Sequence, residues 1–311
     1  MTDGITAGAS VAPLNPRVVL PAGGRNRTAA RLQAAVLRWL VRLAALATAA
    51  VLALLIGYIL VKGVPNLKAG LFDWTYTSDN VSLVPALINT VLMTALSLVI
   101  ATPLGVFAAI WLVEYAPRGS KLVRVVRITT ETLQGIPSIV FGLFGMLFFV
   151  TGLGWRLSLL SGGCTLAIMV LPLIMRTTEE ALMAVPDSYR EGSFGLGAGK
   201  LRTVFSIVLP SAMPGILSGV ILATGRIVGE TAALLYTAGS VPAIPAGSVP
   251  AIPAGADALL DSTRTLAVHM YILSTEGLHV NEAYGTAVVL LVLVLCINAI
   301  SSAIAKKLTK A

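Results

Sequence analysis

The sequence predicts an all-α, polytopic membrane protein with about six membrane-spanning helices. Of its 311 residues, 56% are hydrophobic and only 12% are charged, whereas about a quarter of the residues of a soluble domain are charged. The second observation is a set of six apolar windows, each long enough to cross a hydrocarbon core of about 30 Å as a helix. The windows are 40–61, 84–113, 133–152, 163–185, 204–236 and 284–305.

Residues 1–36 precede the first window, and we expect them to form a disordered tail. Pro13, Pro16, Pro21 and scattered arginines interrupt this stretch. It does not have the pattern of a secretory signal, because the apolar segment that follows is long enough to span. Residues 37–311 are then expected to form one transmembrane domain.

Lysine and arginine are distributed unevenly between the alternating loops. By the positive-inside rule, the loops rich in these residues face the cytoplasm, so both termini are predicted to be cytoplasmic. The opposite loops hold only Lys62, Lys68, Arg156 and Arg264. The basic side comprises Arg17, Arg25, Arg27, Arg31, Arg38, Arg42, Arg118, Lys121, Arg124, Arg127, Arg190, Lys200, Arg202, Lys306, Lys307 and Lys310.

The loop 237–283 is expected on the extracytoplasmic side, and it contains a tandem repeat. Residues 240–247 and 248–255 both read SVPAIPAG. Two prolines per unit prevent a regular helix, so an extended conformation is predicted. A local duplication without function and a lid or receptor contact both remain open. Farther along, residues 259–274 have the apolar spacing of a short amphipathic helix.

The loop 186–203 is expected on the cytoplasmic side and to contain a short helix. Ser188 and Glu191 have the spacing of a capping box that starts a helix, and the glycines at 195, 197 and 199 predict its end. The glycines before Lys200 do not make a nucleotide-binding loop, because Phe194 and Leu201 stand where that motif requires glycine and Ser or Thr. No cofactor is expected.

This loop also carries a family resemblance. Glu191, Gly197, Ile207, Leu209 and Pro210 stand at the spacing E-A-A-x3-G-x9-I-x-L-P, which is typical of the permease subunits of ABC importers. The two alanines are replaced by Gly192 and Ser193, both small enough for close contact with a partner. The resemblance implies the ABC importer permease core, and a coupling helix at Glu191, Gly192, Ser193 and Gly197 that docks on a cytoplasmic ATPase.

Three further segments resemble the PstA-type permeases of phosphate importers. They are 134–145 (QGIPSIVFGLFG), 171–186 (LPLIMRTTEEALMAVP) and 226–239 (RIVGETAALLYTAG). This likeness implies a subunit of an ATP-driven phosphate importer in the bacterial inner membrane. Its implied partners are a PstC-type sister permease, a dimer of a PstB-type ATPase and a PstS-type extracytoplasmic phosphate-binding protein. ATP hydrolysis would occur in the ATPase, so no catalytic residue is expected here.

Two arginines lie inside apolar windows, each with a glutamate four residues later: Arg176 with Glu180, and Arg226 with Glu230. A guanidinium at the centre of a membrane helix costs about 2.5–3.5 kcal/mol on insertion scales, so such groups usually face a bundle interior or a water-filled path. On a helix, residues four apart share a face, so each pair could neutralise itself, with Glu179 as another partner for Arg176. Alternatively, the pairs line a substrate path.

Inorganic phosphate fits these groups. Guanidinium groups match its oxygens bidentately, and Thr177 adds a hydroxyl. A carboxylate such as Glu230 can accept the proton of hydrogen phosphate, which sulfate lacks at neutral pH; this would select phosphate. The remaining alternatives are a permease for another oxyanion, such as sulfate or molybdate, and a self-sufficient secondary transporter or channel. An intramembrane enzyme is not supported, because the predicted spans contain neither a nucleophile with a base nor a metal-ligand cluster.

Overall fold

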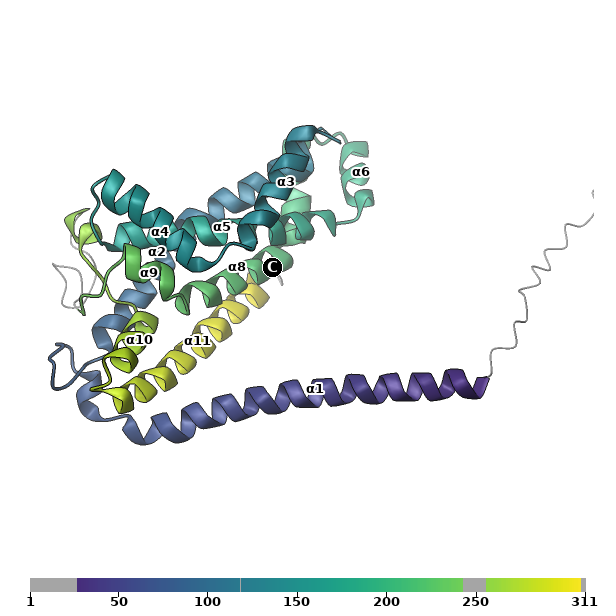
Figure 1. Ribbon diagram of the computed structural model, residues 1–311. Helices are drawn as coiled ribbons and strands as arrows, with labels where there is room; N and C mark the ends of the chain where they lie inside the picture. The colour runs from purple at the N-terminus through teal and green to yellow at the C-terminus, as the bar shows by residue number, and fades with distance from the viewer. Residues whose placement is uncertain (1–26, 118, 243–255, 309–311) are drawn as a thin grey trace, which may run out of the picture. The chain divides into compact units, whose positions relative to one another are not determined.

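The computed structural model describes residues 27–117, 119–242 and 256–308, and all regular structure in these ranges is helical (Figure 1). Short 3₁₀ helices lie at Val64–Asn66, Ala69–Phe72 and Ala256–Leu260, and π-helical turns at Trp111–Tyr115, Met146–Gly152 and Val204–Val208. The α-helices are α1 Arg27–Gly63, α2 Val84–Ile110, α3 Lys121–Gln134, α4 Ser138–Gly145, α5 Leu159–Met183, α6 Asp187–Gly195, α7 Lys200–Thr203, α8 Leu209–Val228, α9 Ala232–Thr237, α10 Leu266–Glu276 and α11 Val280–Leu308.

Five helical segments are long and apolar enough to cross a membrane, and the count is six if the bent pair α3 and α4 forms one span. This confirms the predicted fold class. The chain divides into two compact units, residues 1–56 and 57–311. In the first unit, α1 begins at Arg27, so residues 27–36 are helical and not part of a disordered tail as we expected. Residues 1–26 lie outside the described part of the chain.

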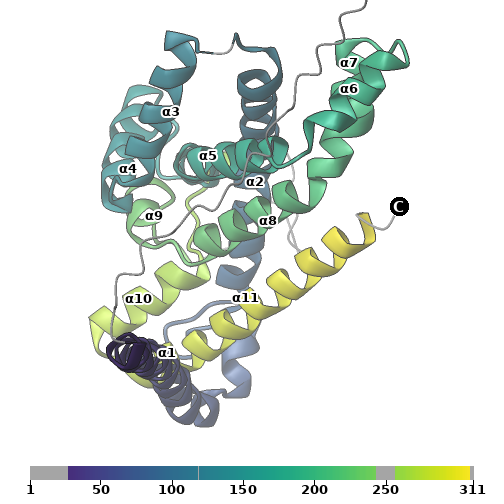
Figure 2. The ribbon, with the colours of Figure 1, turned by 90° about the vertical axis from the view of Figure 1, so that its right-hand side faces the viewer.

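Helix α5 forms the centre of the second unit, packed between α2 and α8 (Figures 1 and 2). Within its most apolar 18 residues, 67% are buried, compared with 33% for α2 and 28% for the span that contains α8. Its start is fixed by the Ser158 hydroxyl, which accepts a hydrogen bond from the Ser161 backbone N–H at 3.2 Å, as expected for an N-cap serine. Helix α5 therefore provides the reference along which the other helices can be placed.

Helix α8 runs antiparallel to α5 at close range. A Cβ at Gly215 would lie 2.6 Å from Ala181 Cβ, and one at Gly219 would overlap the Thr177 side chain. Four residues toward the C-terminus of α8 thus correspond to four residues toward the N-terminus of α5. Continuing this register places Arg226 level with Val170, next to the middle of the 25-residue α5, which is about 37 Å long.

Two of the predicted spans are interrupted, and both interruptions lie near the middle of α5. The window 133–152 is not one helix: α3 and α4 meet at an angle of 103° across residues 135–137, and Gln134 Nε2 donates to the Pro172 carbonyl of α5 at 3.1 Å. The window 204–236 is also broken, because α8 ends at Val228 and α9 begins at Ala232. Beyond the breaks α4 packs on α9, where a Cβ at Gly142 would lie 2.7 Å from Ala233 Cα.

At the end of the bundle opposite α6, a buried polar cluster joins α10 to α2 and to the segment after α9. Arg264 Nε donates to the Ser240 carbonyl at 2.6 Å, and its guanidinium lies over the Tyr76 ring at 5.7 Å. Arg264 Nη1 also contacts His269 Nδ1 at 3.4 Å. The helix predicted at 259–274 is present in shorter form as α10, and its His269 is fully buried beside Arg264. Residues 243–255, most of the SVPAIPAG repeat, lie outside the described residues.

The cluster makes stability depend on pH. Burial, and then the charge of Arg264, lowers the pKa of His269 from 6.5 to about 4. The unfolded imidazole thus takes up a proton at a higher pH than the folded one. The contribution of neutral His269 to the free energy of unfolding is fully present above pH 6.5. It falls as the pH drops toward 4, by up to about 1.4 kcal/mol per pH unit.

We predict that His269→Asn flattens this dependence. The unfolding midpoint of the purified protein, measured between pH 7.5 and 4.5, should fall less steeply for the variant than for the wild type. His279→Asn, at the partly exposed histidine just before α11 and 3.8 Å from Glu282, is the matched control and should not flatten the dependence. Equal slopes for His269→Asn and the wild type would contradict the assignment.

Candidate substrate path and coupling helix

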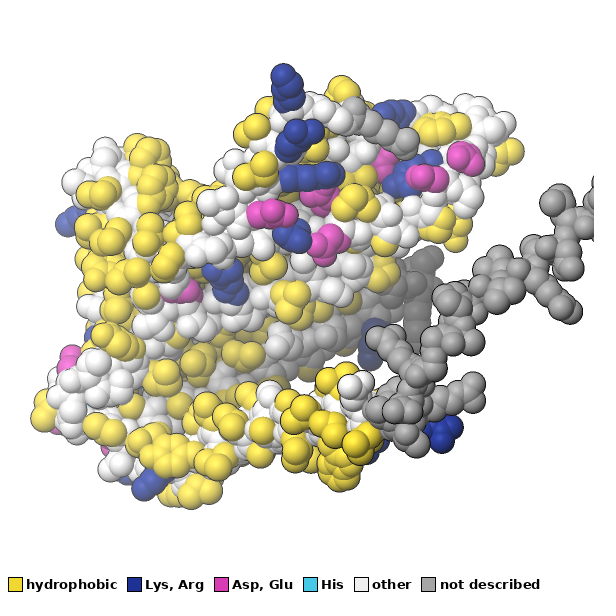
Figure 3. Space-filling model, turned by 45° about the vertical axis from the view of Figure 1, so that its right-hand side comes forward, with side chains coloured by type: hydrophobic (Ala, Val, Ile, Leu, Met, Phe, Trp, Pro, Cys, Tyr) yellow, Lys and Arg dark blue, Asp and Glu magenta, His cyan; other side chains and the backbone are white. Residues whose placement is uncertain are grey.

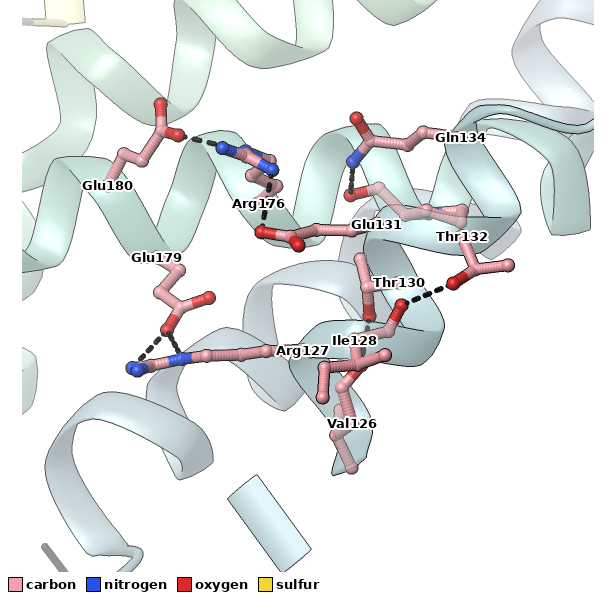
Figure 4. Close-up of polar contacts among 11 residues, drawn as sticks. Val126, Arg127, Ile128, Thr130, Glu131, Thr132, Gln134, Arg176, Glu179 and Glu180 are labelled. Carbon is pink, nitrogen blue, oxygen red and sulfur yellow. Dashed lines mark hydrogen bonds and ion pairs between the residues drawn. The ribbon is translucent and has the colours of Figure 1, made fainter. Parts of the chain in front are cut away.

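A charged network joins α3 to α5 on the half of the bundle nearer α6. Arg176 Nε donates to Glu180 Oε1 at 3.0 Å, which confirms the pairing expected from their spacing, and Arg176 Nη1 contacts Glu131 Oε1 at 3.1 Å. Glu179 does not pair with Arg176; it accepts from Arg127 Nε at 2.6 Å (Figure 4). Glu131 and Arg127 were not singled out as site residues, since their partners lie about 50 positions away in the sequence.

These residues surround a hollow of about 170 Å³, lined by Arg127, Thr130, Glu131, Arg176, Glu179, Glu180 and Met183. Side chains of both charges gather at this end of the molecule (Figure 3). Three carboxylates face two guanidinium groups, so the lining carries a formal charge of −1, and both arginines are engaged by glutamates. An anion could bind here only after displacing a carboxylate.

Thr177 does not belong to this network. Its hydroxyl donates to the Leu173 carbonyl of its own helix at 2.9 Å, and its side chain lies against Gly219 of α8. Thr177 thus contributes to the α5–α8 contact, on a different face of α5 from Arg176.

Arg226 lies in the last turn of α8 and Glu230 in the break that follows it, and they do not form the expected pair on one helix face. Helix α8 ends at Val228, so the spacing of four residues no longer brings the side chains together. Glu230 Oε1 instead accepts from the Ala233 backbone N–H at 3.1 Å, which caps the first turn of α9. Within the described residues, no hydrogen bond or ion pair is formed by the Arg226 guanidinium, which is half-buried.

The exposed face of α8 that leads to Arg226 is unlike a lipid-facing surface. Ser211, Pro214 and Ser218 are exposed along it, and Leu222 is the one large apolar residue of this row. The two serine hydroxyls donate to carbonyls of their own helix at 2.7 and 2.9 Å. A small, polar face that ends at an unpaired guanidinium beside a helix break is the arrangement expected of a water-filled path.

The short helix predicted in the loop 186–203 is α6, and the glycines at 195, 197 and 199 correctly predicted where it ends. It ends in a Schellman motif: Ala198 N–H donates to the Ser193 carbonyl at 3.1 Å and Gly197 N–H to the Phe194 carbonyl at 2.9 Å. Gly197 has φ +82°, a conformation that glycine adopts without strain. The capping box was wrong, because α6 begins at Asp187 after Pro186 and has no side-chain cap.

The surface of α6 mixes polar and apolar groups. Glu191 and Gly192 are exposed, and Leu196, just after the helix, is 91% exposed. Ser193 was expected to touch a partner, but it is buried within the chain and its hydroxyl lies 2.8 Å from that of Thr203. Ser193 therefore holds α6 to α7, while Glu191, Gly192 and Gly197 remain available to a partner.

Comparison with known proteins identifies the family. Residues 101–311 match the model of the binding-protein-dependent transport system inner membrane component. The chain belongs to this family. It is a multi-pass inner-membrane permease subunit of an ABC importer, which works with a separate ATPase and a periplasmic binding protein.

Several curated relatives are similar over long stretches. The probable ABC transporter permease protein YqgI of Bacillus subtilis is 34% identical, over 84% of this chain and 92% of the relative. The phosphate transport system permease protein PstA 1 of Mycobacterium tuberculosis H37Rv is 35% identical, over 68% and 66%. PstA of Xylella fastidiosa is 40% identical, over 57% and 62%.

Solved transporters share the fold at lower identity. The permease in the crystal structure of a bacterial alginate ABC transporter aligns with a TM-score of 0.60 at 16% identity, covering 90% of this chain and 99% of that one. A chain of the inward-facing MetNI methionine ABC transporter aligns with a TM-score of 0.51 at 21% identity, covering 81% and 97%. These likenesses bear on the fold alone.

The position of Arg226 yields a labelling prediction. In a chain with Cys164 and Cys296 replaced by serine, Arg226→Cys in membrane vesicles should react with a charged methanethiosulfonate reagent, because a side chain on a water-filled path is accessible to such a reagent. Ile227→Cys is the matched control: residue 227 is 2% exposed, and its labelling should be at least about tenfold slower, since it requires local opening. Equal rates would contradict a water-filled path at Arg226.

Proposed function

We propose that this permease forms one half of the path for inorganic phosphate in an ATP-driven importer. The observation that carries the proposal is Arg226, whose guanidinium has no partner in the described part of the chain and lies level with the middle of α5, next to a helix break. The PstA relatives, 35–40% identical over part of their length, support phosphate as the substrate. The proposed partners are a PstC-type permease, a PstB-type ATPase dimer and a PstS-type binding protein.

The proposed orientation places α6 and both termini on the cytoplasmic side, following the distribution of basic residues. Helix α6 then docks on the ATPase through Glu191, Gly192 and the exposed Leu196, and the buried polar cluster around Arg264 lies on the extracytoplasmic side. Phosphate moving inward meets Arg226 first, and the α3–α5 network lies nearer the exit.

The two arginines would serve different steps. Arg226 is ready to bind, because no described group competes for its donors, and weak binding at one site suits a conduit. Arg176 is held by Glu131 and Glu180. An anion that reached it would have to displace these carboxylates, which favours quick release over retention.

Glu230 is placed to discriminate between oxyanions. Its Oε1 is occupied by the Ala233 N–H, while Oε2 has no partner within the described residues. A free carboxylate oxygen in the break after Arg226 can accept the proton of hydrogen phosphate, but it would repel sulfate, which has no proton to donate.

Phosphate uptake should depend on Arg226. Arg226→Gln should reduce phosphate uptake by at least about 30-fold, because a hydrogen bond to a charged group worth about 2 kcal/mol is lost at the path. Uptake of radiolabelled phosphate is measured in cells with all partner subunits, and membrane abundance is measured by immunoblotting. Arg156→Gln, at an exposed position of a predicted extracytoplasmic loop, should leave uptake unchanged. Wild-type uptake by Arg226→Gln would exclude the proposed role.

The second prediction concerns selectivity. Glu230→Gln removes the negative charge and keeps an acceptor for Ala233, so excess sulfate should compete with phosphate in the variant and have little effect on the wild type. Arsenate, which keeps a proton as phosphate does, should compete in both. If sulfate remained without effect on the variant, Glu230 would not be the discriminating group.

A further inference from the structure

A single arginine at the start of α6 ties this helix to the ends of two others. Arg190 Nη2 donates to Glu114 Oε1 at 2.8 Å, and Arg190 Nε donates to the same oxygen at 3.1 Å. The guanidinium also donates to the carbonyls of Leu182 at 2.9 Å and Val185 at 2.8 Å. Glu114 lies in the π-helical turn that extends α2. The Leu182 carbonyl lies in the last turn of α5, and the Val185 carbonyl lies in the link between α5 and α6. One side chain thus joins α6 to both α2 and α5.

The ion pair is shielded from water. The Arg190 side chain is 16% exposed and that of Glu114 is 8% exposed, unlike the Arg176 network, where exposures are 45–61%. Breaking a buried pair leaves a charge without compensation, which is strongly destabilising, so its geometry is firmly held. Asp187, which also contacts Arg190 at 3.2 Å, is 72% exposed and adds little.

Packing around the pair is sparse. A hollow of about 620 Å³ separates α6 from the region where α2 ends and α3 begins, and its lining includes Glu114, Val123, Arg190, Phe194 and Lys200. Besides the ion pair, Lys200 lies over the Tyr115 ring at 5.1 Å. The direct contact between α6 and the end of α2 is therefore the ion pair, with the Lys200 contact from α7 beside it.

At its other end α6 is tied to α8 by a different route. Ser193 and Thr203 are hydrogen-bonded, and α7 continues through the π-helical turn Val204–Val208 into α8. Without the Arg190 contacts, α6 would remain joined to α7 and, through residues 184–186, to α5, and it could move relative to the end of α2 (Figure 2).

We propose that the Glu114–Arg190 ion pair locks α6 to α2 and α5, so that a pull on α6 moves the centre of the bundle as one body. This inference rests on the proposed docking of the ATPase on α6. Arg190 and Glu114 are positioning residues in this account; neither touches the substrate. The forked guanidinium is required because an ammonium group cannot reach one carboxylate and two carbonyls together in this planar geometry.

The test measures the distance between α6 and α2 in the complete importer, purified through a tag on this chain. Spin labels are attached at Ser188→Cys and Leu104→Cys, both exposed positions, after Cys164 and Cys296 have been replaced by serine. In the otherwise unchanged protein, the distance distribution should be narrow and the same with and without ATP. In Glu114→Gln it should broaden and shift with ATP, while the ATPase still co-purifies.

Arg190→Lys provides a second variant that keeps the charge and should show the same broadening. The amount of substrate imported per ATP should fall about tenfold or more in both, as for a typical coupling free energy. Lys68→Gln, which removes the 3.3 Å contact with Glu282 at the other end of the bundle, is the matched control. It should keep the narrow distribution.

Three results would overturn the inference: a distribution in Glu114→Gln that stays narrow, a distance in the unchanged protein that already shifts with ATP, or loss of the ATPase from both variants. The last result would mean that the pair only maintains the docking surface. Leu196→Asp tests the docking itself, because it should release the ATPase from the importer. If the ATPase still co-purified with this variant, the proposed docking site on α6 would be wrong, and with it the basis of the inference. Phosphate uptake, measured in parallel, tests the substrate separately.

Discussion

The structure depends on one constraint: inside a membrane, backbone N–H and C=O groups must find partners within the protein. Helix α5 meets this by being continuous and buried between α2 and α8. The α3–α4 and α8–α9 segments cannot meet it as continuous helices, because both are interrupted level with the middle of α5. Gln134 secures one interruption to the Pro172 carbonyl, and Glu230 caps the helix after the other. Beyond the breaks α4 packs on α9, so the irregular backbone is supported inside the bundle. Broken helices near mid-depth are where transporters commonly place their substrate sites.

The same constraint explains why the charges on the bundle helices differ in role. Arg176 and Arg127 lie on continuous helices that face one another, so neighbouring carboxylates neutralise them. Arg226 lies two residues before a helix end, and the change in chain direction carries Glu230 into a capping contact instead of an ion pair. Its charge therefore has no partner among the described residues. Arg190 is a third case, in which a shielded pair is used to hold helices together.

Sequence patterns predicted the helical class, six apolar windows, the short helix α6 and its end at a glycine, because these depend on local composition and backbone preference. The Arg176–Glu180 pair also followed from spacing. Spacing failed for Arg226 and Glu230, since Gly229 gives little sign that α8 stops there. It failed for Ser188 because the N-cap position is occupied by Pro186, two residues earlier. The contacts of Arg190 with Glu114 and of Arg127 with Glu179 join residues 76 and 52 positions apart, and a single sequence holds no signal for them.

The central claim is that the break beside Arg226 lines the phosphate path between two permease subunits. The most direct measurement is a cryo-electron microscopy structure of the complete importer in lipid nanodiscs with phosphate present. The account predicts that Arg226 and Glu230 face a water-filled space shared with the sister permease, near the middle of the bilayer. A structure in which Arg226 forms an ion pair with a carboxylate of the sister subunit in a dry interface, or faces lipid, would contradict it.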